Sequence, residues 1–460
     1  MKKAIALTLA GAMSVGLLAG CGGAASSSAS SSSAASTEAS STAEAASTTA
    51  AAGSNTVNTT DPIELTMSWW GGDSRHEAYQ AAIKAFEAKY PNITVTSDYG
   101  AWSGWEEKQS TALTAGNAAD VMQVNWNWLY QYSATGQSFQ DLNQYSDVLD
   151  LTQWDASPIE ACTVANELQC VPVAMTGRIF YWNMNTFKQA GITEVPKTLD
   201  DLMAAGTAFA ALGDDYYPLS IGAYDRMILM TFYLESKYGT PWVSDGTLNY
   251  TAEQITEGIE FIKSLEDGHV IPTVEQMKGA GFDSIDKSEQ WIDGRYAGIF
   301  EWDSAASKYL GALSDNTGFT VGDEIKFGDK ANGGFSKVSL GLAITETCEH
   351  PVEAAALINF LLNEEEGASI MGTQCGLVAS KAGLAAAEAA GTVNELVKEA
   401  NGKVMAFVDQ PFDPYYESTS LKDTTEGIYT DVFEGYSYGD YDAAEAAQIL
   451  IDGVNEAIGA

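Results

Sequence analysis

A hydrophobic pattern that switches between two periods constrains the fold of this chain more than any other feature. Apolar and polar residues alternate over 63–69 and again over 93–97, and residues 121–124 are apolar apart from Gln123. Alternation with a period of two is typical of half-buried strands, and short apolar runs are typical of fully buried ones. The sequence therefore predicts three strands in this region.

Helical periods fill the two intervals between these strands. Apolar residues recur on one face over 74–90, and Ser74 and Glu77 have the spacing of a capping box at its start. A second helix is expected over 104–115. Strands that alternate with helices pair in parallel, because each crossover helix returns the chain to the same end of the sheet. We therefore expect a doubly wound α/β sheet.

Residues 1–60 are a different kind of sequence. Two lysines precede an apolar run that is too short to span a membrane, and the run ends just before Cys21. This order is typical of a secretory signal peptide, which we place at 1–20. The following residues are mostly Ser, Ala and Thr and cannot bury enough apolar surface to fold. We expect residues 21–61 to form a disordered tether that begins at the cysteine.

The residues Leu18-Ala19-Gly20-Cys21 resemble the lipobox of bacterial lipoproteins. In that family the cysteine thiol is acylated and the chain is cut before it. The resemblance implies that Cys21 becomes a lipidated N-terminus, which anchors the protein to the cell membrane and leaves the rest of it outside the cytoplasm. The alternative is an ordinary cleaved signal peptide with an incidental cysteine.

Acidic residues dominate the chain after the tether. The net charge of −39 arises after residue 60, because Lys2 and Lys3 cancel Glu38 and Glu44 before it. A surface of this charge repels phosphate and anionic headgroups, so we expect neither nucleic-acid binding nor peripheral membrane binding. The remaining length is ample for two domains of ordinary size.

The cysteines give little evidence of a redox or metal site. Cys162 and Cys170 flank a short turn-like segment and are candidates for a disulfide across a hairpin. Cys348 and Cys375 carry no comparable signal, and no spacing of Cys and His is typical of zinc. We expect no metal and no cofactor. Free buried thiols and disulfides both remain open for these four residues.

Tryptophans gather where the three predicted strands end. The pairs are Trp69 and Trp70, Trp102 and Trp105, and Trp126 and Trp128. Their polar neighbours are Asp73, Arg75, Asn125 and Asn127. In a doubly wound sheet these strand ends form one edge, which is where ligands bind. Aromatic faces stack on the C–H faces of sugar rings and polar groups bond the hydroxyls, although core packing is the alternative for each Trp. We predict a carbohydrate site.

The chain from 62 to 460 resembles the extracellular solute-binding proteins of ABC importers, in the family that includes maltose-binding proteins. The order and spacing of several motifs carry the resemblance. They are Trp69-Trp70-Gly71-Gly72, Ala119-Asp120-Val121, Val171-Pro172, Phe180-Tyr181-Trp182-Asn183, Gly191-Ile192, Pro196-Lys197-Thr198-Leu199, 291–299, Gly333-Gly334 and 350–355. The motif Ala119-Asp120-Val121 lacks the proline that is usual in the family, and Trp182 stands where the family has a tyrosine.

The resemblance implies a periplasmic-binding-protein-like fold of two α/β lobes, each a doubly wound sheet flanked by helices, with a three-segment hinge near residues 172, 332 and 380. The expected segments are 62–172 and 333–380 for the first lobe, and 173–332 and 381–460 for the second. It also implies that a monomer closes on a carbohydrate and is recognised by the permease subunits of an ABC transporter.

The resemblance places further ligand-binding residues on the second lobe and at its border. They are Arg178, Tyr224, Asp225, Trp302, Asp303 and Phe335. Each also has a structural alternative: an arginine can form an ion pair, an aspartate can cap a helix and a tryptophan can pack in the core. Several aromatic platforms favour an oligosaccharide over a single sugar.

Two rival functions fit parts of the pattern. A secreted glycosidase could use paired carboxylates, but motifs such as GxSxG and HExxH are absent. The candidates for such a pair are Asp73, Asp225, Glu301 and Asp303. A ferric-ion-binding protein of the same superfamily could use Tyr415 and Tyr416 as phenolate ligands. The interpretation that we carry forward is a binding protein without catalytic residues.

Overall fold

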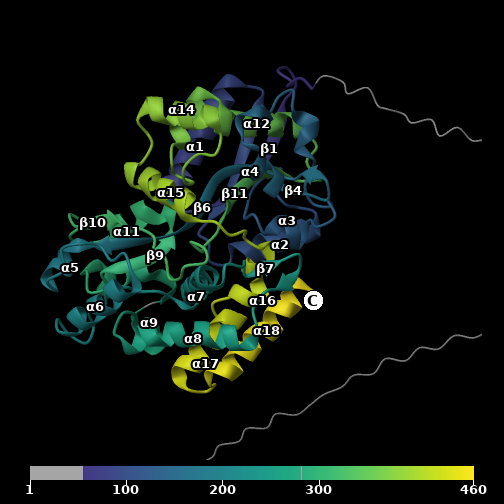
Figure 1. The fold of residues 1–460 in the computed structure, drawn as a ribbon. Helices are drawn as coiled ribbons and strands as arrows, with labels where there is room; N and C mark the ends of the chain where they lie inside the picture. Colours follow the sequence, from purple (N-terminus) through teal and green to yellow (C-terminus); the bar gives the residue numbers. More distant parts are fainter. Residues whose placement is uncertain (1–54, 281, 460) are drawn as a thin grey trace, which may run out of the picture. The chain divides into compact units, whose positions relative to one another are not determined.

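The structure is a computed structural model that describes residues 55–280 and 282–459 (Figure 1). The expected signal peptide, Cys21 and most of the expected tether lie outside the described residues. Within the described ranges, no helix has the length and apolar character needed to cross a membrane.

The N-terminal strands and helices form where the hydrophobic periods predict them. They are β1 (Ile63–Trp70), α1 (Asp73–Lys89), β2 (Ile93–Gly100), α2 (Trp105–Ala115) and β3 (Val121–Val124). Strand β1 lies between β2 and β3 and runs parallel to both, so the parallel arrangement is confirmed for this part.

The expected capping box of α1 is wrong. Gly72 is the N-cap residue and no side chain caps the helix. The helix begins at Asp73, one residue earlier than expected, so Ser74 already lies within the first turn and cannot occupy the capping position.

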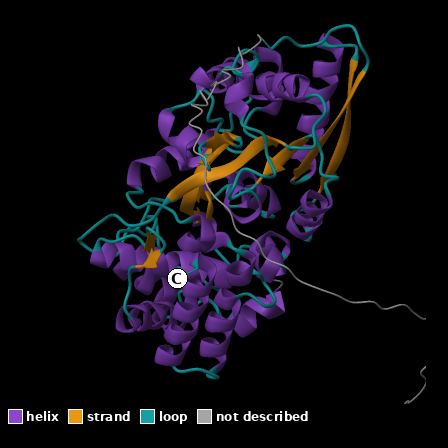
Figure 2. Ribbon diagram, turned by 90° about the vertical axis from the view of Figure 1, so that its right-hand side faces the viewer, coloured by secondary structure: helices purple, strands orange, loops and turns teal. Residues whose placement is uncertain are grey.

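One long strand serves both lobes (Figure 2). It is β6 (Val171–Asn183), and its first half pairs with β11 (Ser336–Ile344), which pairs in turn with β3. Its second half pairs with β9 (Gly298–Trp302) and β10 (Phe319–Val321). All of these pairings are antiparallel, and the strand order is β10-β6-β11-β3-β1-β2 with β9 on β6. The two lobes therefore share the strand β6.

Buried apolar residues form separate cores on the two sides of the shared strand. One core contains Trp69, Phe86 and Leu342, and the largest core of the second lobe contains Trp182 and Met227. Besides the elements above, the first lobe holds the hairpin β4 (Thr163–Val164) and β5 (Glu167–Leu168), and α3 (Trp128–Tyr132), α4 (Ala156–Ala161), α12 (Pro351–Asn363), α13 (Glu365–Met371) and α14 (Lys381–Ala390). Cys162 and Cys170, beside this hairpin, are buried thiols in the structure.

Helix α14 corrects the expected chain crossing near residue 380. It packs against α12 and α13, and Ser380 at its N-cap donates a hydrogen bond to Asn363 Oδ1 at 2.6 Å. These contacts place α14 with the first lobe, whereas a crossing at 380 would place it in the second.

The second lobe is mostly helical. Its helices are α5 (Met184–Gln189), α6 (Leu199–Ala210), α7 (Ala223–Tyr238), α8 (Ala252–Asp267), α9 (Val274–Ala280), α10 (Glu289–Ile292), α11 (Ala306–Ala312), α15 (Glu395–Phe407), α16 (Thr419–Lys422), α17 (Ile428–Tyr438) and α18 (Ala443–Ile458), with the hairpin β7 (Val243–Ser244) and β8 (Thr247–Leu248).

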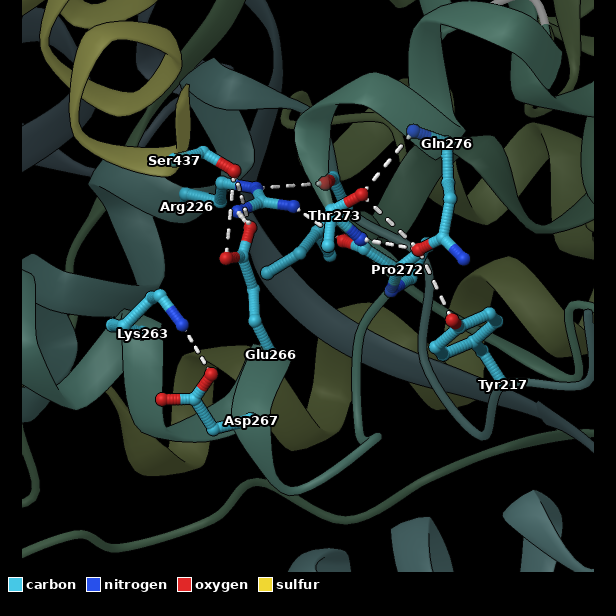
Figure 3. Close-up of polar contacts among 10 residues, drawn as sticks. Tyr217, Arg226, Lys263, Glu266, Asp267, Pro272, Thr273, Gln276 and Ser437 are labelled. Carbon is cyan, nitrogen blue, oxygen red and sulfur yellow. Dashed lines mark hydrogen bonds and ion pairs between the residues drawn. The ribbon is translucent and has the colours of Figure 1, made fainter. Parts of the chain in front are cut away.

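A buried ion pair connects three of these helices. Figure 3 shows the guanidinium of Arg226 on α7 facing the carboxylate of Glu266 on α8. Arg226 also donates to the carbonyl of Pro272 at 2.6 Å, and Ser437 on α17 donates to Glu266 at 3.2 Å. Each charge has a partner, so this cluster holds the helices together and leaves no charge for a ligand.

Residues 55–61 contact the first lobe, so the expectation of a disordered tether is wrong for its last residues. The backbone N–H of Asn58 donates to Glu353 Oε1 at 2.8 Å, and Asn92 donates to the carbonyl of Asn58 at 2.9 Å. The Asn58 side chain also accepts from the backbone of Asp61, which closes a turn. These specific bonds hold the segment although its composition is polar.

Candidate ligand-binding cleft

A cavity of about 440 Å³ is lined by residues of both lobes. The first lobe contributes the ends of β1 and β3 and the segment between β2 and α2, and the second contributes the start of α7, the end of β9 and part of α11. The shared strand β6, strand β11 and the segment around α16 complete the wall. Half of the sequence-predicted binding residues lie here: Trp70, Arg75, Trp102, Asn125, Arg178, Tyr224, Asp225 and Trp302.

Trp70 and Trp102 form an aromatic platform on the first lobe. Their ring centroids lie 5.1 Å apart, and Trp102 is 40% exposed, which is unusual for so large an apolar side chain. Trp128 is fully buried beneath them, 5.6 Å from Trp70 and 6.3 Å from Trp102. The rings that face the cavity are therefore supported by a third ring in the core.

The other strand-end tryptophans are core residues, which corrects the expectation that all six face a ligand. Trp69, Trp105, Trp126 and Trp128 are buried in the first lobe. Adjacent residues of a strand point to opposite faces, so when Trp70 faces the cavity Trp69 must face the core. The indole of Trp126 is further fixed by a 2.7 Å hydrogen bond to the carbonyl of Ala161.

Two predicted polar neighbours on the first lobe do not line the cavity either. Asn127 is buried and donates to the carbonyl of Glu417 at 3.1 Å, so it acts in packing between segments. Asp73 is exposed at the start of α1, where its charge complements the helix dipole.

Arg178 is the centre of an ionic network on the second lobe. Its side chain is 2% exposed, and its Nη1 lies 2.9 Å from Asp225 Oδ1 and 2.9 Å from Glu301 Oε1. It also lies 4.3 Å from the centroid of the Trp302 ring, within cation–π range. The structure thus brings four of the six expected residues together, namely Arg178, Tyr224, Asp225 and Trp302. It adds Glu301, which the sequence indicated only as part of a catalytic pair.

Asp225 serves both the network and the helix. Its Oδ2 accepts from the backbone N–H of Gly222 at 3.1 Å and so caps α7, while its Oδ1 faces Arg178. Burial raises the pKa of Asp225 to about 6, against the opposing charge of Arg178 and with a further rise from Glu301. Capping and ion pairing, which the sequence could not separate, both occur.

Asp303 and Phe335 are placed behind the cavity wall, which corrects their expected role. Asp303 is 1% exposed and accepts hydrogen bonds from Thr176 at 2.5 Å and Asn401 at 2.7 Å, so it ties β6 to α15. Burial raises the pKa of Asp303 to about 6. Phe335 packs 4.1 Å from the ring of Phe412 and is also buried. Both residues shape the wall without reaching the space inside it.

A second ionic cluster, which the sequence did not indicate, lies beside Trp302, whose ring centroid is 4.7 Å from Lys337 Nζ. Lys337 on β11 pairs with Glu417, the last residue of the 3₁₀ turn Pro414–Glu417. The other oxygen of Glu417 accepts from the hydroxyl of Tyr224 at 2.8 Å. Lys422 of α16 lies 3.9 Å from that same oxygen. Lys337, the single charged residue of the strand 336–344, was the signal that could have identified this cluster.

Burial and neighbouring charges oppose each other in this cluster. Burial lowers the pKa of Lys337 to about 8 although Glu417 opposes the change, and Lys422 and Arg178 lower it further. Burial would raise the pKa of Glu417, but the charges of Lys337 and Lys422 and its hydrogen bonds outweigh burial and lower the pKa to about 2. At neutral pH the cluster therefore holds charged lysines around one carboxylate.

The cavity is richer in basic groups than the rest of the protein. Its basic residues are Arg75, Arg178, Lys308, Lys337 and Lys422, and its acidic residues are Asp225, Glu301 and Glu417. In the whole chain, 62 acidic residues face 23 basic ones. Acidic residues thus outnumber basic ones in the whole chain, whereas basic residues outnumber acidic ones in the lining of this cavity. This local excess of positive charge favours an anionic ligand.

The rival sites gain no geometric support. Among residues 55–280 and 282–459, no group of three or more His, Cys, Asp or Glu side chains is placed to hold a metal. The hydroxyl of Tyr416 lies 2.9 Å from Thr231 Oγ1 and is buried, so it is already used. Asp225 and Glu301 both face Arg178, so the two carboxylates are engaged in ion pairs and do not form a catalytic pair.

Comparison with solved structures shows the same fold. A periplasmic solute-binding protein from Pectobacterium atrosepticum has 34% identity and a TM-score of 0.82, over 86% of this chain and 99% of that one. A periplasmic oligogalacturonide-binding protein from Yersinia enterocolitica, solved with saturated digalacturonic acid, has 32% identity and a TM-score of 0.81 over the same shares, 86% and 99%. The two-lobed α/β fold is therefore confirmed.

Sequence comparison agrees. A binding protein of Brucella abortus is 26% identical over 199 residues, which are 43% of this chain and 48% of that protein, so the match spans about half of the relative's length. The family model described as bacterial extracellular solute-binding protein matches residues 72–368. That family acts outside the cytoplasm. This chain belongs to the bacterial extracellular solute-binding protein family.

Proposed function

We propose that this protein is the substrate-binding protein of an ABC importer and that it captures an acidic oligosaccharide in the cleft for delivery to the permease. The observation that carries the proposal is the pairing of an aromatic platform with an excess of cations in one cavity. The platform matches the apolar face of a sugar ring, and the cations match carboxylates on that sugar.

Because the protein as a whole is acidic, the basic residues of the cleft are evidence for an anionic ligand. A chain with a net charge of −39 repels anions over most of its surface, so an anionic ligand needs local positive charge to bind. Arg75 supplies such charge beside the platform, because its hydrogen bonds go to the carbonyls of Gln374 and Trp70 and no carboxylate among residues 55–280 and 282–459 forms an ion pair with it. The Yersinia relative, which was solved with saturated digalacturonic acid, supports a uronic-acid ligand of this kind.

Binding without turnover follows from how the carboxylates are held. General acid–base catalysis on a glycosidic bond needs two carboxyl groups on opposite sides of that bond. Asp225 and Glu301 instead share the guanidinium of Arg178, which keeps them oriented toward each other. On this proposal the protein holds its sugar intact. The proposal also includes a monomer without a cofactor, whose lobes close on the ligand.

A thermal-shift titration with digalacturonic acid tests this function. We expect the melting temperature to rise with ligand concentration, because the ligand binds only the folded state. Chromatography of the mixture should recover the disaccharide intact. A series without any stabilisation by acidic sugars would contradict the proposal, and shorter products would favour a glycosidase.

The lipid anchor is a separate part of the proposal. It rests on the sequence before Cys21, which resembles a lipobox. We expect Cys21→Ser to move the protein out of the membrane fraction or to leave it unprocessed. A Cys21→Ser protein that is cut normally and stays in the membrane fraction would place the anchor elsewhere.

A further inference from the structure

Lys422 is the cation of the cleft that the protein itself leaves least satisfied. Its side chain is only 15% exposed, and its nearest carboxylate oxygen is Glu417 Oε1 at 3.9 Å. Among residues 55–280 and 282–459 its ammonium group donates no hydrogen bond. An ammonium group that lines the cavity and bonds no protein acceptor there can bind an anionic group of a ligand.

Glu417 does not satisfy Lys422, because its two oxygens already have nearer partners. Oε2 pairs with Lys337, and Oε1 accepts from the Tyr224 hydroxyl at 2.8 Å. The two lysines and one carboxylate therefore carry one positive charge in excess. A second carboxylate, supplied by a ligand, would balance it.

The side chain of Lys422 extends from the second lobe toward the first. It ends α16, whose Leu421 belongs to the core of the second lobe. Its Nζ lies 5.4 Å from the centroid of the Trp102 ring, which belongs to the aromatic platform of the first lobe. A sugar stacked on this platform would thus present its ring substituents beside the ammonium group.

We propose that Lys422 binds the carboxylate of the sugar ring that stacks on Trp102, and that this contact makes closure of the lobes selective for acidic sugars. The proposal rests on the function proposed above and adds the residue that recognises the carboxylate of the sugar. A ligand that stacks on one lobe and pairs with a lysine of the other stabilises the closed state with both contacts. A neutral sugar of the same shape makes only the first contact.

Calorimetry on wild type and Lys422→Gln tests the assignment with two probes. They are digalacturonic acid and the neutral digalactose of the same linkage, in which each carboxylate is replaced by a hydroxymethyl group. Lys326→Gln is the control, because Lys326 is an exposed lysine of the same lobe and its loss changes the net charge equally. Lys422→Arg keeps the charge and tests rescue.

The expected result is a loss of affinity that depends on the acid. Lys422→Gln should bind digalacturonic acid about 10- to 100-fold more weakly, the range for a lost hydrogen bond to a charged group, and bind digalactose as wild type does. Lys326→Gln should match wild type with both sugars. Lys422→Arg should retain most of the preference for the acid.

Closure of the lobes on the ligand is a second measurement, and a Lys422 with a merely structural role would not affect it. In small-angle X-ray scattering, saturating digalacturonic acid should reduce the radius of gyration of wild type and reduce it less for Lys422→Gln. A Lys422→Gln protein that keeps the wild-type preference and closes fully would overturn this inference. Wild type that binds both sugars equally well would instead overturn the acidic ligand itself, so the two failures are distinguishable.

Discussion

The first lobe faces the cavity with the indole rings of Trp70 and Trp102, whereas the second lobe faces it with the ion pairs of Arg178. Stacking on a ring depends on apolar area and tolerates many sugars, while an ionic contact depends on the charge and position of one substituent. The difference indicates that the first lobe supplies affinity for sugar rings and that the second supplies discrimination between them.

Two tryptophans of the first lobe sharpen this comparison, because they touch each other and differ in burial. Trp128→Ala should lower the free energy of unfolding by about 3–5 kcal/mol, because it leaves a cavity beneath the platform. Trp102→Ala, at a ring that is 40% exposed, should cost far less stability. Denaturant unfolding of the two variants measures the difference. Equal losses would mean that Trp102 is part of the core as well.

The next effect concerns affinity. Trp102→Ala should weaken the binding of acidic and neutral sugars by the same factor, since stacking does not depend on the carboxylate. By analogy with bases that stack on aromatic side chains, the loss should be about 1–3 kcal/mol. Titration calorimetry with digalacturonic acid and digalactose measures it. A loss confined to the acidic sugar would break the division of roles between the lobes.

A smaller effect is expected from pH, through Lys337. Its pKa of about 8 lies below the ordinary value because of burial, and the charged groups that face it are Glu417, Lys422 and Arg178. Affinity for an acidic sugar should therefore fall as pH rises through 8, by at most about tenfold per pH unit, because the lysine loses its charge. Affinity for digalactose should stay constant over the same range.

Stability should respond to the same group in the opposite direction. Between pH 8 and 10.5, the ordinary pKa of a lysine, the unfolded chain binds more protons at Lys337 than the folded chain does. The contribution of this residue to the free energy of unfolding therefore rises with pH over that window, by up to about 1.4 kcal/mol per pH unit. Lys337→Gln should remove both dependences. Profiles identical to those of wild type would exclude Lys337 as their origin.

The sequence predicted the elements that depend on local pattern. Strands β1 to β3 and helices α1 and α2 were predicted because hydrophobic period is a property of neighbouring residues. The shared strand β6 was not predicted, because its pairing with β11, β9 and β10 joins segments far apart in the chain. The same limit explains the misplaced crossing near residue 380.

The candidate site was predicted in part for a similar reason. Residue type and position at the strand ends indicated Trp70 and Trp102. Only tertiary packing, however, decides which of the adjacent residues Trp69 and Trp70 faces the cavity and which faces the core. The Lys337–Glu417 pair joins residues 80 positions apart, and no local pattern marks such a contact. The two lysines that we expect to recognise the acid, Lys337 and Lys422, were therefore missed in the sequence, although Arg178 was indicated.

The most direct test of the account is the ratio of the two dissociation constants, for digalactose and for digalacturonic acid, on the wild-type protein at low and at high salt. The account predicts that the acidic sugar binds at least about tenfold more tightly at low salt, and that added salt reduces this preference by screening the cations of the cleft. Equal binding of the two sugars at low salt, or a preference for the neutral one, would contradict it.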